Sequence, residues 1–252
     1  KSALGLNYLY QNQVFDFSTT YTNAAAIGQI VGHTVTPRWR LRKEMKTFRA
    51  EAEFGATRQF LKAPLDSYWQ LDPRLTLGCH SGARSEISLS YQWSWLDYDS
   101  REQTDAQGLS MTNTALSLQG QLVELAWTQT WDEKRRWRTT TRGGVEINQD
   151  NGPGFYDYRN YRVVQELRFR DTKWDVRLRA RLSHYDYPTQ PVSADDLSPR
   201  RRTLFAVTFQ AERMLSKHLK AFGSYAWENS ISNLSFDEYR ASTLLGGLAA
   251  TF

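Results

Sequence analysis

Apolar and polar residues alternate with a period of two along most of this chain, and this pattern limits the possible folds more than any other feature. Trp174, Val176 and Leu178, for example, alternate with Asp175 and Arg177, and the same alternation runs through residues 48–57 and 86–95. Successive side chains of a β-strand point to opposite faces, whereas a helix of 3.6 residues per turn would mix the two sets. The pattern therefore predicts amphipathic β-strands.

The alternating segments divide the chain into about twelve strands. We expect these strands near residues 3–17, 33–43, 46–60, 69–79, 82–95, 112–131, 136–148, 160–170, 173–185, 202–214, 218–230 and 239–252. Tight turns are expected at residues 42–46, 79–82, 132–136, 170–173 and 215–218, and longer loops near 18–32, 61–68, 96–111, 149–159, 186–201 and 231–238. Short periplasmic turns and longer extracellular loops are typical of outer-membrane barrels. We therefore predict an all-β, antiparallel transmembrane β-barrel that forms one domain over residues 1–252.

Two of the expected strands are irregular. Pro73 cannot donate a backbone hydrogen bond, so we expect a bulge or local unpairing within 69–79. In 112–131 the apolar residues change from even-numbered positions, up to Leu118, to odd-numbered positions, from Val123. A bulge around Gly120 would produce this change. Ten or fourteen strands remain alternatives to twelve.

Composition excludes several other classes of protein. No run of about 18 apolar residues is present and the mean hydropathy is −0.62, which excludes a helical membrane span but not a barrel, whose lumen-facing residues are polar. Cys79 is the only cysteine, so there is no zinc-finger spacing and no intrachain disulfide. The net charge of +5 is spread along strands and not clustered, and we expect no nucleic-acid partner. No charged-then-apolar leader follows Lys1, so any export signal is expected to lie outside this numbering.

The apolar face is expected to meet lipid and not to fill a core. It carries many small residues, among them Ala50, Ala52, Gly143, Ala180 and Gly223, which would leave a void inside a twelve-stranded barrel. Aromatic residues lie near the expected strand ends, where belts of tyrosine and tryptophan flank the apolar band of outer-membrane barrels. We therefore expect an outer-membrane location with lipid as the main partner.

The last expected strand resembles the C-terminal signal of bacterial outer-membrane β-barrel proteins. Tyr239, Leu244, Leu248 and the terminal Phe252 fit that signal, which implies recognition by the barrel-insertion machinery. The preceding YAWENSISNLSFDEYR also resembles the closing hairpin of barrels attached to tetratricopeptide-repeat domains, as in exopolysaccharide exporters and surface-lipoprotein assembly modifiers. That narrower resemblance implies a periplasmic or surface protein partner.

With the apolar face outward, charged residues line the lumen. The expected lining residues are Arg38, Arg40, Arg42, Arg49, Glu51, Glu53, Glu86, Arg138, Arg142, Glu166, Arg168, Asp175, Arg177, Arg179 and Arg181. Rings of arginine and lysine favour anions in channels. The sequence thus predicts a channel or exporter for a small or polymeric anionic solute, with arginine in excess over local carboxylates at 38–42 and 177–181. The alternative is a non-conducting barrel, sealed by ion pairs, that anchors or sheathes a larger assembly.

No catalytic site or cofactor is expected. The four histidines lie outside any His-x-Ser run of the kind that outer-membrane phospholipases contain, and we predict that the chain is not an enzyme. Aromatic-aspartate-tyrosine patterns at 95–98, 155–158 and 185–187 suit sugars or divalent cations, but an interfacial aromatic girdle is the favoured interpretation. No metal site is predicted.

Overall fold

The computed structural model describes residues 2–14, 29–62, 66–193 and 195–250. Its strands are β1 (Ser2–Val14), β2 (Gln29–Glu44), β3 (Phe48–Leu61), β4 (Tyr68–Leu71), β5 (Arg74–Ser81), β6 (Ser85–Tyr98), β7 (Gln103–Thr104), β8 (Ser110–Met111), β9 (Ser117–Thr130), β10 (Trp137–Asp150), β11 (Tyr158–Arg170), β12 (Trp174–Pro191), β13 (Pro199–Met214), β14 (Leu219–Ser232) and β15 (Tyr239–Ala250). One short 3-10 helix, η1 (Ser235–Asp237), precedes β15. No helix in the described ranges is long and apolar enough to cross a membrane.

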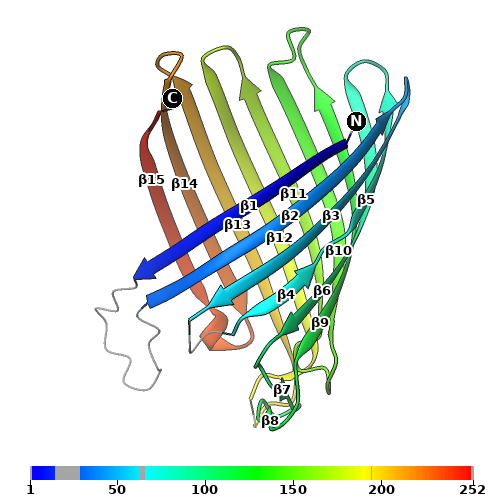
Figure 1. The fold of residues 1–252 in the computed structure, drawn as a ribbon, viewed down its shortest axis with the longest axis vertical. Helices are drawn as coiled ribbons and strands as arrows, with labels where there is room; N and C mark the ends of the chain where they lie inside the picture. Colours follow the sequence, from blue (N-terminus) through cyan, green and yellow to red (C-terminus); the bar gives the residue numbers. More distant parts are fainter. Residues whose placement is uncertain (1, 15–28, 63–65, 194, 251–252) are drawn as a thin grey trace.

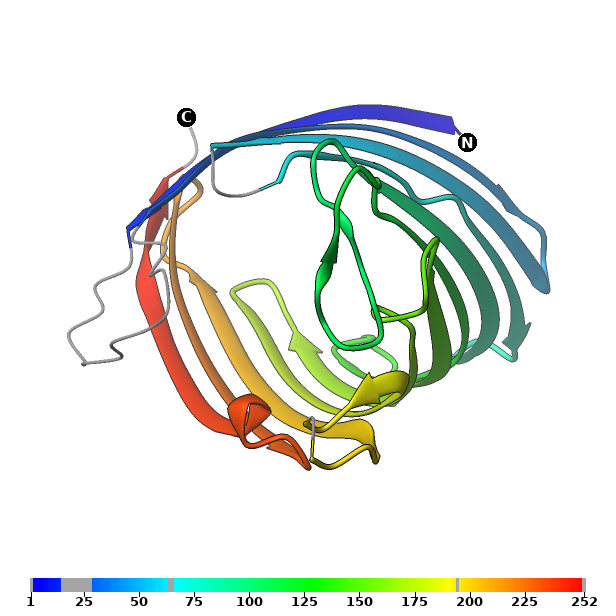
Figure 2. The same ribbon diagram turned by 90° about the horizontal axis from the view of Figure 1, so that it is seen from below.

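All strands except β7 and β8 belong to one antiparallel sheet in which chain neighbours pair in order. The sheet curls into a barrel (Figure 2). β4 and β5 occupy one position between β3 and β6, so the sheet has the predicted twelve strand positions. Within the described residues, β1 is hydrogen-bonded only to β2 and β15 only to β14, and the two ends of the sheet approach each other in Figure 2. The predicted antiparallel barrel is confirmed.

The short and long connections lie on opposite rims, as expected. Tight turns join the strands at the upper rim in Figure 1, and the long loops and η1 lie at the lower rim. Asp171 closes one of the tight turns, because its Oδ1 accepts hydrogen bonds from the backbone N–H groups of Lys173 (2.8 Å) and Trp174 (2.7 Å). These two donors hold the pKa of the Asp171 carboxyl below its usual range.

The two irregular strands behave differently. Asp72 and Pro73 separate β4 from β5, so the unpairing expected at Pro73 is confirmed. The bulge expected around Gly120 is wrong, because Ser94 pairs with Gly120 in an unbroken register and the strand begins only at Ser117. The change in the apolar pattern has another cause, because some apolar residues face inward here. Leu122, like Leu116 before the strand, is buried among polar inward-facing neighbours.

Burial is inverted relative to a soluble protein. In the described part of the chain only four hydrophobic residues are buried, whereas ten polar or charged residues are, among them Ser90, Glu124 and Ser183. Outward-facing residues such as Leu125 and Val163 are about half exposed, at 56% and 53%. A contiguous exposed apolar surface of this kind requires an apolar environment. The barrel is therefore a transmembrane one, with lipid outside and a polar lumen inside.

Spin labels test this orientation. Labels at Trp93, Leu178, Phe209 and Leu248 are expected to be accessible to a lipid-soluble relaxant, because these residues share the outward face. Labels at Arg40, Glu53, Ser90 and Arg179 are expected to respond to a water-soluble relaxant, because these residues line the lumen. Electron paramagnetic resonance in reconstituted bilayers makes the measurement, and mixed accessibility within either set would contradict the orientation.

Candidate functional site

A cavity of about 600 Å³ lies within the barrel. Eight arginines and five glutamates line it, an excess of three formal positive charges: Arg40, Arg49, Arg74, Arg138, Arg142, Arg162, Arg179 and Arg181, with Glu51, Glu53, Glu86, Glu124 and Glu146. Nine of the residues predicted to line the lumen are in this set. Threonine and serine side chains, Asn160, Tyr185, Ala126 and Val164 complete the lining.

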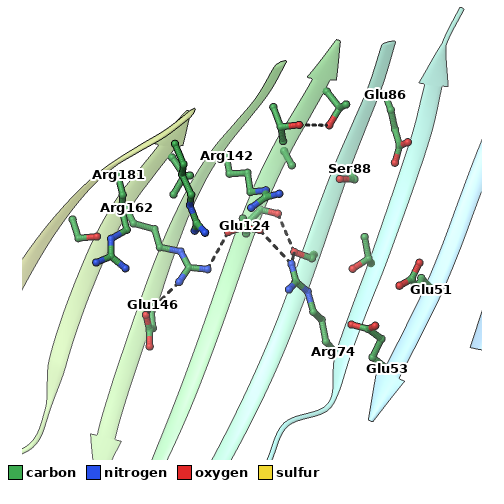
Figure 3. A pocket seen from close by; sticks show the side chains of 18 of the residues that line it. Glu51, Glu53, Arg74, Glu86, Ser88, Glu124, Arg142, Glu146, Arg162 and Arg181 are labelled. Atoms are coloured by element: carbon green, nitrogen blue, oxygen red, sulfur yellow. Dashed lines mark hydrogen bonds and ion pairs between the residues drawn. The ribbon is translucent and has the colours of Figure 1, made fainter. Parts of the chain in front are cut away.

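Glu124 is the most buried carboxylate of the cavity. It comes from β9 and is 8% exposed. Its Oε1 lies 3.2 Å from Arg74 Nη2 and its Oε2 lies 2.9 Å from Arg162 Nη2, so two arginines reach it from opposite sides (Figure 3). Arginine-carboxylate contacts satisfy both charged groups where water is scarce. Glu124 therefore connects Arg74 of β5 and Arg162 of β11 through ion pairs.

The other cavity carboxylates are also engaged. Arg40 pairs with Glu53 and lies 3.3 Å from Glu51, and Arg49 Nη2 lies 2.9 Å from Glu86 Oε1. Glu146 accepts hydrogen bonds from the Tyr158 hydroxyl (2.8 Å) and the Asn160 amide (3.2 Å), and Arg162 lies 3.9 Å away. No cavity carboxylate is left to neutralise further arginines.

Three cavity arginines have no such partner. Within the described residues, the guanidinium groups of Arg138, Arg142 and Arg179 form no ion pair or side-chain hydrogen bond, although all three line the cavity. Glu166 stands directly across from Arg179 in the β11–β12 register, but no ion pair joins them. The positive excess is therefore concentrated on the wall formed by β10 and β12.

The strand register arranges these arginines in successive rows. Arg138, Arg168 and Arg177 share one row near the tight turns, Arg179 lies in the next row away from them, and Arg142 and Arg181 in the one after. Rows of same-face residues are two positions apart, about 6.8 Å along a strand. Arg162 occupies the following row, so arginine recurs along the wall at every step.

The remaining predicted lining residues lie outside this cavity. Arg168 and Arg177 both bind Asp175, at 2.9 Å and 3.2 Å, close to the tight-turn rim. Arg38 lines a second cavity, of about 350 Å³, beside β1, and Arg42 pairs with Glu44. The expectation of unpaired arginines throughout 38–42 and 177–181 is therefore wrong. Arg40 and Arg177 are paired and Arg181 lies 3.5 Å from Glu228, while the unpaired Arg138 and Arg142 come from another strand.

Several interior residues were not predicted. Tyr158, Tyr185 and Tyr187 are inward-facing and contact one another, with ring centroids 5.7 Å to 6.3 Å apart, so the girdle interpretation is wrong for them. Asn160 and Ser183 are almost fully buried, at 2% and 1% exposed. Asn160 lies two positions from Arg162, and Ser183 lies two positions from Arg181. Strand alternation alone would therefore have placed both residues in the lumen.

Long loops pack together at the lower rim. The segment carrying β7 and β8 leans across the mouth of the barrel in Figure 2. The Tyr156 hydroxyl anchors it, accepting a hydrogen bond from Arg101 (3.3 Å) and lying 2.9 Å from the Thr104 hydroxyl. This loop cluster narrows the approach to the cavity from that rim.

The expected insertion signal lies on β15. Leu244 and Leu248 face outward and are 82% and 68% exposed. Tyr239 lies on the opposite face, where its hydroxyl accepts a hydrogen bond from Arg202 (2.9 Å) and contacts Glu228. Phe252 lies outside the described residues.

Comparison with known proteins assigns the chain to no family. No family model and no curated protein matches the chain. The NanC porin is similar over 87% of this chain and 94% of its own, with 9% identity and a TM-score of 0.42. The β-domain of the Bordetella autotransporter BrkA (99% and 98%, 11% identity, TM-score 0.43) and a loop-deletion mutant of OmpT, an outer membrane protein of Vibrio cholerae (98% and 99%, 7% identity, TM-score 0.46), are also similar.

A polar lumen inside an apolar band, with short turns on one rim and long loops on the other, is the organisation of outer-membrane barrels. The geometry agrees with the location expected from the sequence. The likeness to barrels attached to tetratricopeptide-repeat domains stays a prediction. Within the described ranges, no cluster of three or more histidine, cysteine, aspartate or glutamate residues could hold a metal ion.

Proposed function

We propose that this protein is an outer-membrane channel or exporter that passes a small or polymeric anionic solute through its lumen. One observation carries the proposal: every cavity glutamate is engaged by hydrogen-bonding or cationic side chains, while Arg138, Arg142 and Arg179 are free to meet a solute. An unpaired guanidinium facing water attracts anions and repels cations.

The row arrangement supports passage more than tight capture. An anion leaving one arginine row would meet the next about 6.8 Å further along the wall. Conduction requires several sites of moderate affinity instead of one deep site. Arg179 is exposed to the lumen, and the others are partly exposed, so the sites are wet and their affinity is moderate.

The alternative is a non-conducting barrel that anchors or sheathes a larger assembly with a periplasmic or surface partner. The β7–β8 segment across the mouth favours it, as does the bridge through Glu124. We also propose that the lumen is not catalytic. His80 is the one lumen-side histidine with an ion-pair contact among the described residues, 3.8 Å from Glu86, and no described serine, threonine or cysteine side chain forms a hydrogen bond with its ring.

Planar-bilayer recording separates the two functions. The channel proposal requires measurable conductance and a reversal potential of the sign given by anion preference under a salt gradient. A folded, inserted barrel without conductance would favour the sealed alternative, and a cation-preferring conductance would reject the anionic solute.

Deleting Phe252 tests the outer-membrane assignment. We expect the deletion to lower outer-membrane levels severalfold, because Phe252 is proposed to be read by the insertion machinery. Immunoblots of membrane fractions measure the effect. Deleting Lys1 is the matched control, and equal losses for the two deletions would contradict the proposed role of Phe252.

A further inference from the structure

The outer face of the barrel carries an apolar groove of about 500 Å³ that the proposed function does not use. It crosses five strands, β6 and β9 to β12, along one row of the sheet, where Leu89, Leu125, Gly143, Val163 and Leu182 are successive neighbours. Gly143 makes the groove, because a Cβ placed there would meet nothing within 4 Å. The position is a gap in an otherwise continuous apolar surface.

A polar cluster lies at the β12 end of this groove. His184 lines the groove, and its Nδ1 lies 2.9 Å from the Thr203 hydroxyl while its Nε2 lies 3.4 Å from Asp186 Oδ1. The next row towards the long-loop rim reads Arg159, Asp186 and Arg201 across adjacent strands. The order from groove to rim is therefore an apolar row, then a polar row that contains His184, then a charged row.

The charged row has a positive excess. Arg201 lies 3.5 Å from Asp186, and its side chain is 65% exposed. Arg159 is exposed and forms no ion pair with any described residue, although it stands across from Asp186. One carboxylate therefore faces two guanidinium groups on the lipid side of the barrel, at the edge of the apolar band.

We propose that this surface binds one lipid with an anionic, phosphate-bearing headgroup, its acyl chain in the Gly143 groove and its phosphate on Arg159 and Arg201. Charge complementarity selects the occupant, because guanidinium groups bind phosphate with paired hydrogen bonds and a zwitterionic headgroup would bring a cation to the same arginines. The groove volume lies within the range of ligand pockets. The site is independent of whether the lumen conducts.

Native mass spectrometry of the purified barrel tests the site, with phosphatidylglycerol and phosphatidylcholine as probes at equal concentrations. The wild type is expected to retain phosphatidylglycerol preferentially. Replacing both arginines, in R159Q/R201Q, is expected to lower that retention about fivefold, the effect of losing a partly solvated ion pair. Gly143→Leu is expected to lower retention of both lipids, because the side chain would occupy the groove.

Gly223→Leu is the matched control. Gly223 is an outward-facing glycine of β14 with equally open surroundings, but it lies away from the groove. The proposal holds if this control binds lipid as the wild type does while G143L and R159Q/R201Q do not. It is overturned if R159Q/R201Q keeps wild-type retention of phosphatidylglycerol, or if G223L loses as much as G143L. The double arginine variant changes exposed side chains only, so it keeps the test valid should G143L fail to fold.

Discussion

Replacing Arg138, Arg142 and Arg179 together with glutamine is expected to remove most of the anion preference of the lumen. The change lowers the formal excess charge of the cavity lining from three to zero while preserving hydrogen-bonding capacity. A unit charge about 8 Å away contributes about 0.5 kcal/mol in water, so the three together favour an anion by up to about 1.5 kcal/mol and disfavour a cation by as much. The anion-to-cation permeability ratio therefore changes by up to about a hundredfold. The reversal potential under a potassium chloride gradient measures the ratio.

Stability should change little in this triple variant. None of the three arginines has an ion-pair partner among the described residues, so no buried carboxylate is stranded. The control is a second triple glutamine variant, at Lys134, Arg135 and Lys217. These residues lie in tight turns, so the variant makes the same change in net charge away from the cavity. A reversal potential that moves equally in both variants, or in neither, would contradict a selective role for the cavity arginines.

Strand number, orientation and lumen polarity could be predicted from the sequence because they depend on a local rule. Residues two positions apart share a face, so Arg177, Arg179 and Arg181 had to point the same way once Leu178 was assigned to lipid. The same rule places Ser90 and Glu124 inside. Where it was applied without reference to other strands, as for Gly120, it produced a bulge that does not exist.

Ion pairing could not be predicted, because it depends on register between strands. Whether Arg177 is free depends on Asp175 beside it and on Arg168 across the ladder, and three arginines, Arg168, Arg170 and Arg177, share that one carboxylate. Arg138 and Arg142 flank the three threonines of β10. They are unpaired because Thr140, and not an acidic residue, shares their face between them. The outer groove was also beyond prediction, since it arises where Gly143 meets larger residues of four strands.

Glu124→Gln is expected to produce the largest loss of stability of any single lumen substitution. Glu124 is buried and its two oxygens each face an arginine, so the neutral amide leaves Arg74 and Arg162 without their shared counter-charge. Breaking a buried ion pair costs about 3–5 kcal/mol, and the partial exposure of both arginines places this case near about 3 kcal/mol. Urea unfolding in detergent micelles, followed by tryptophan fluorescence and by heat-resistant gel mobility, measures the loss.

Glu166→Gln provides the comparison, because Glu166 faces the same lumen without an ion pair and its replacement should cost well under 1 kcal/mol. Adding Arg162→Leu to Glu124→Gln should recover part of the loss, since the double variant no longer leaves Arg162 facing an uncharged partner. Equal stability of the two glutamine variants would show that the Glu124 bridge does not hold the walls together. In that case the barrel would rest on its backbone ladders alone, and the ion pairs of the lumen would serve only to leave Arg138, Arg142 and Arg179 unneutralised.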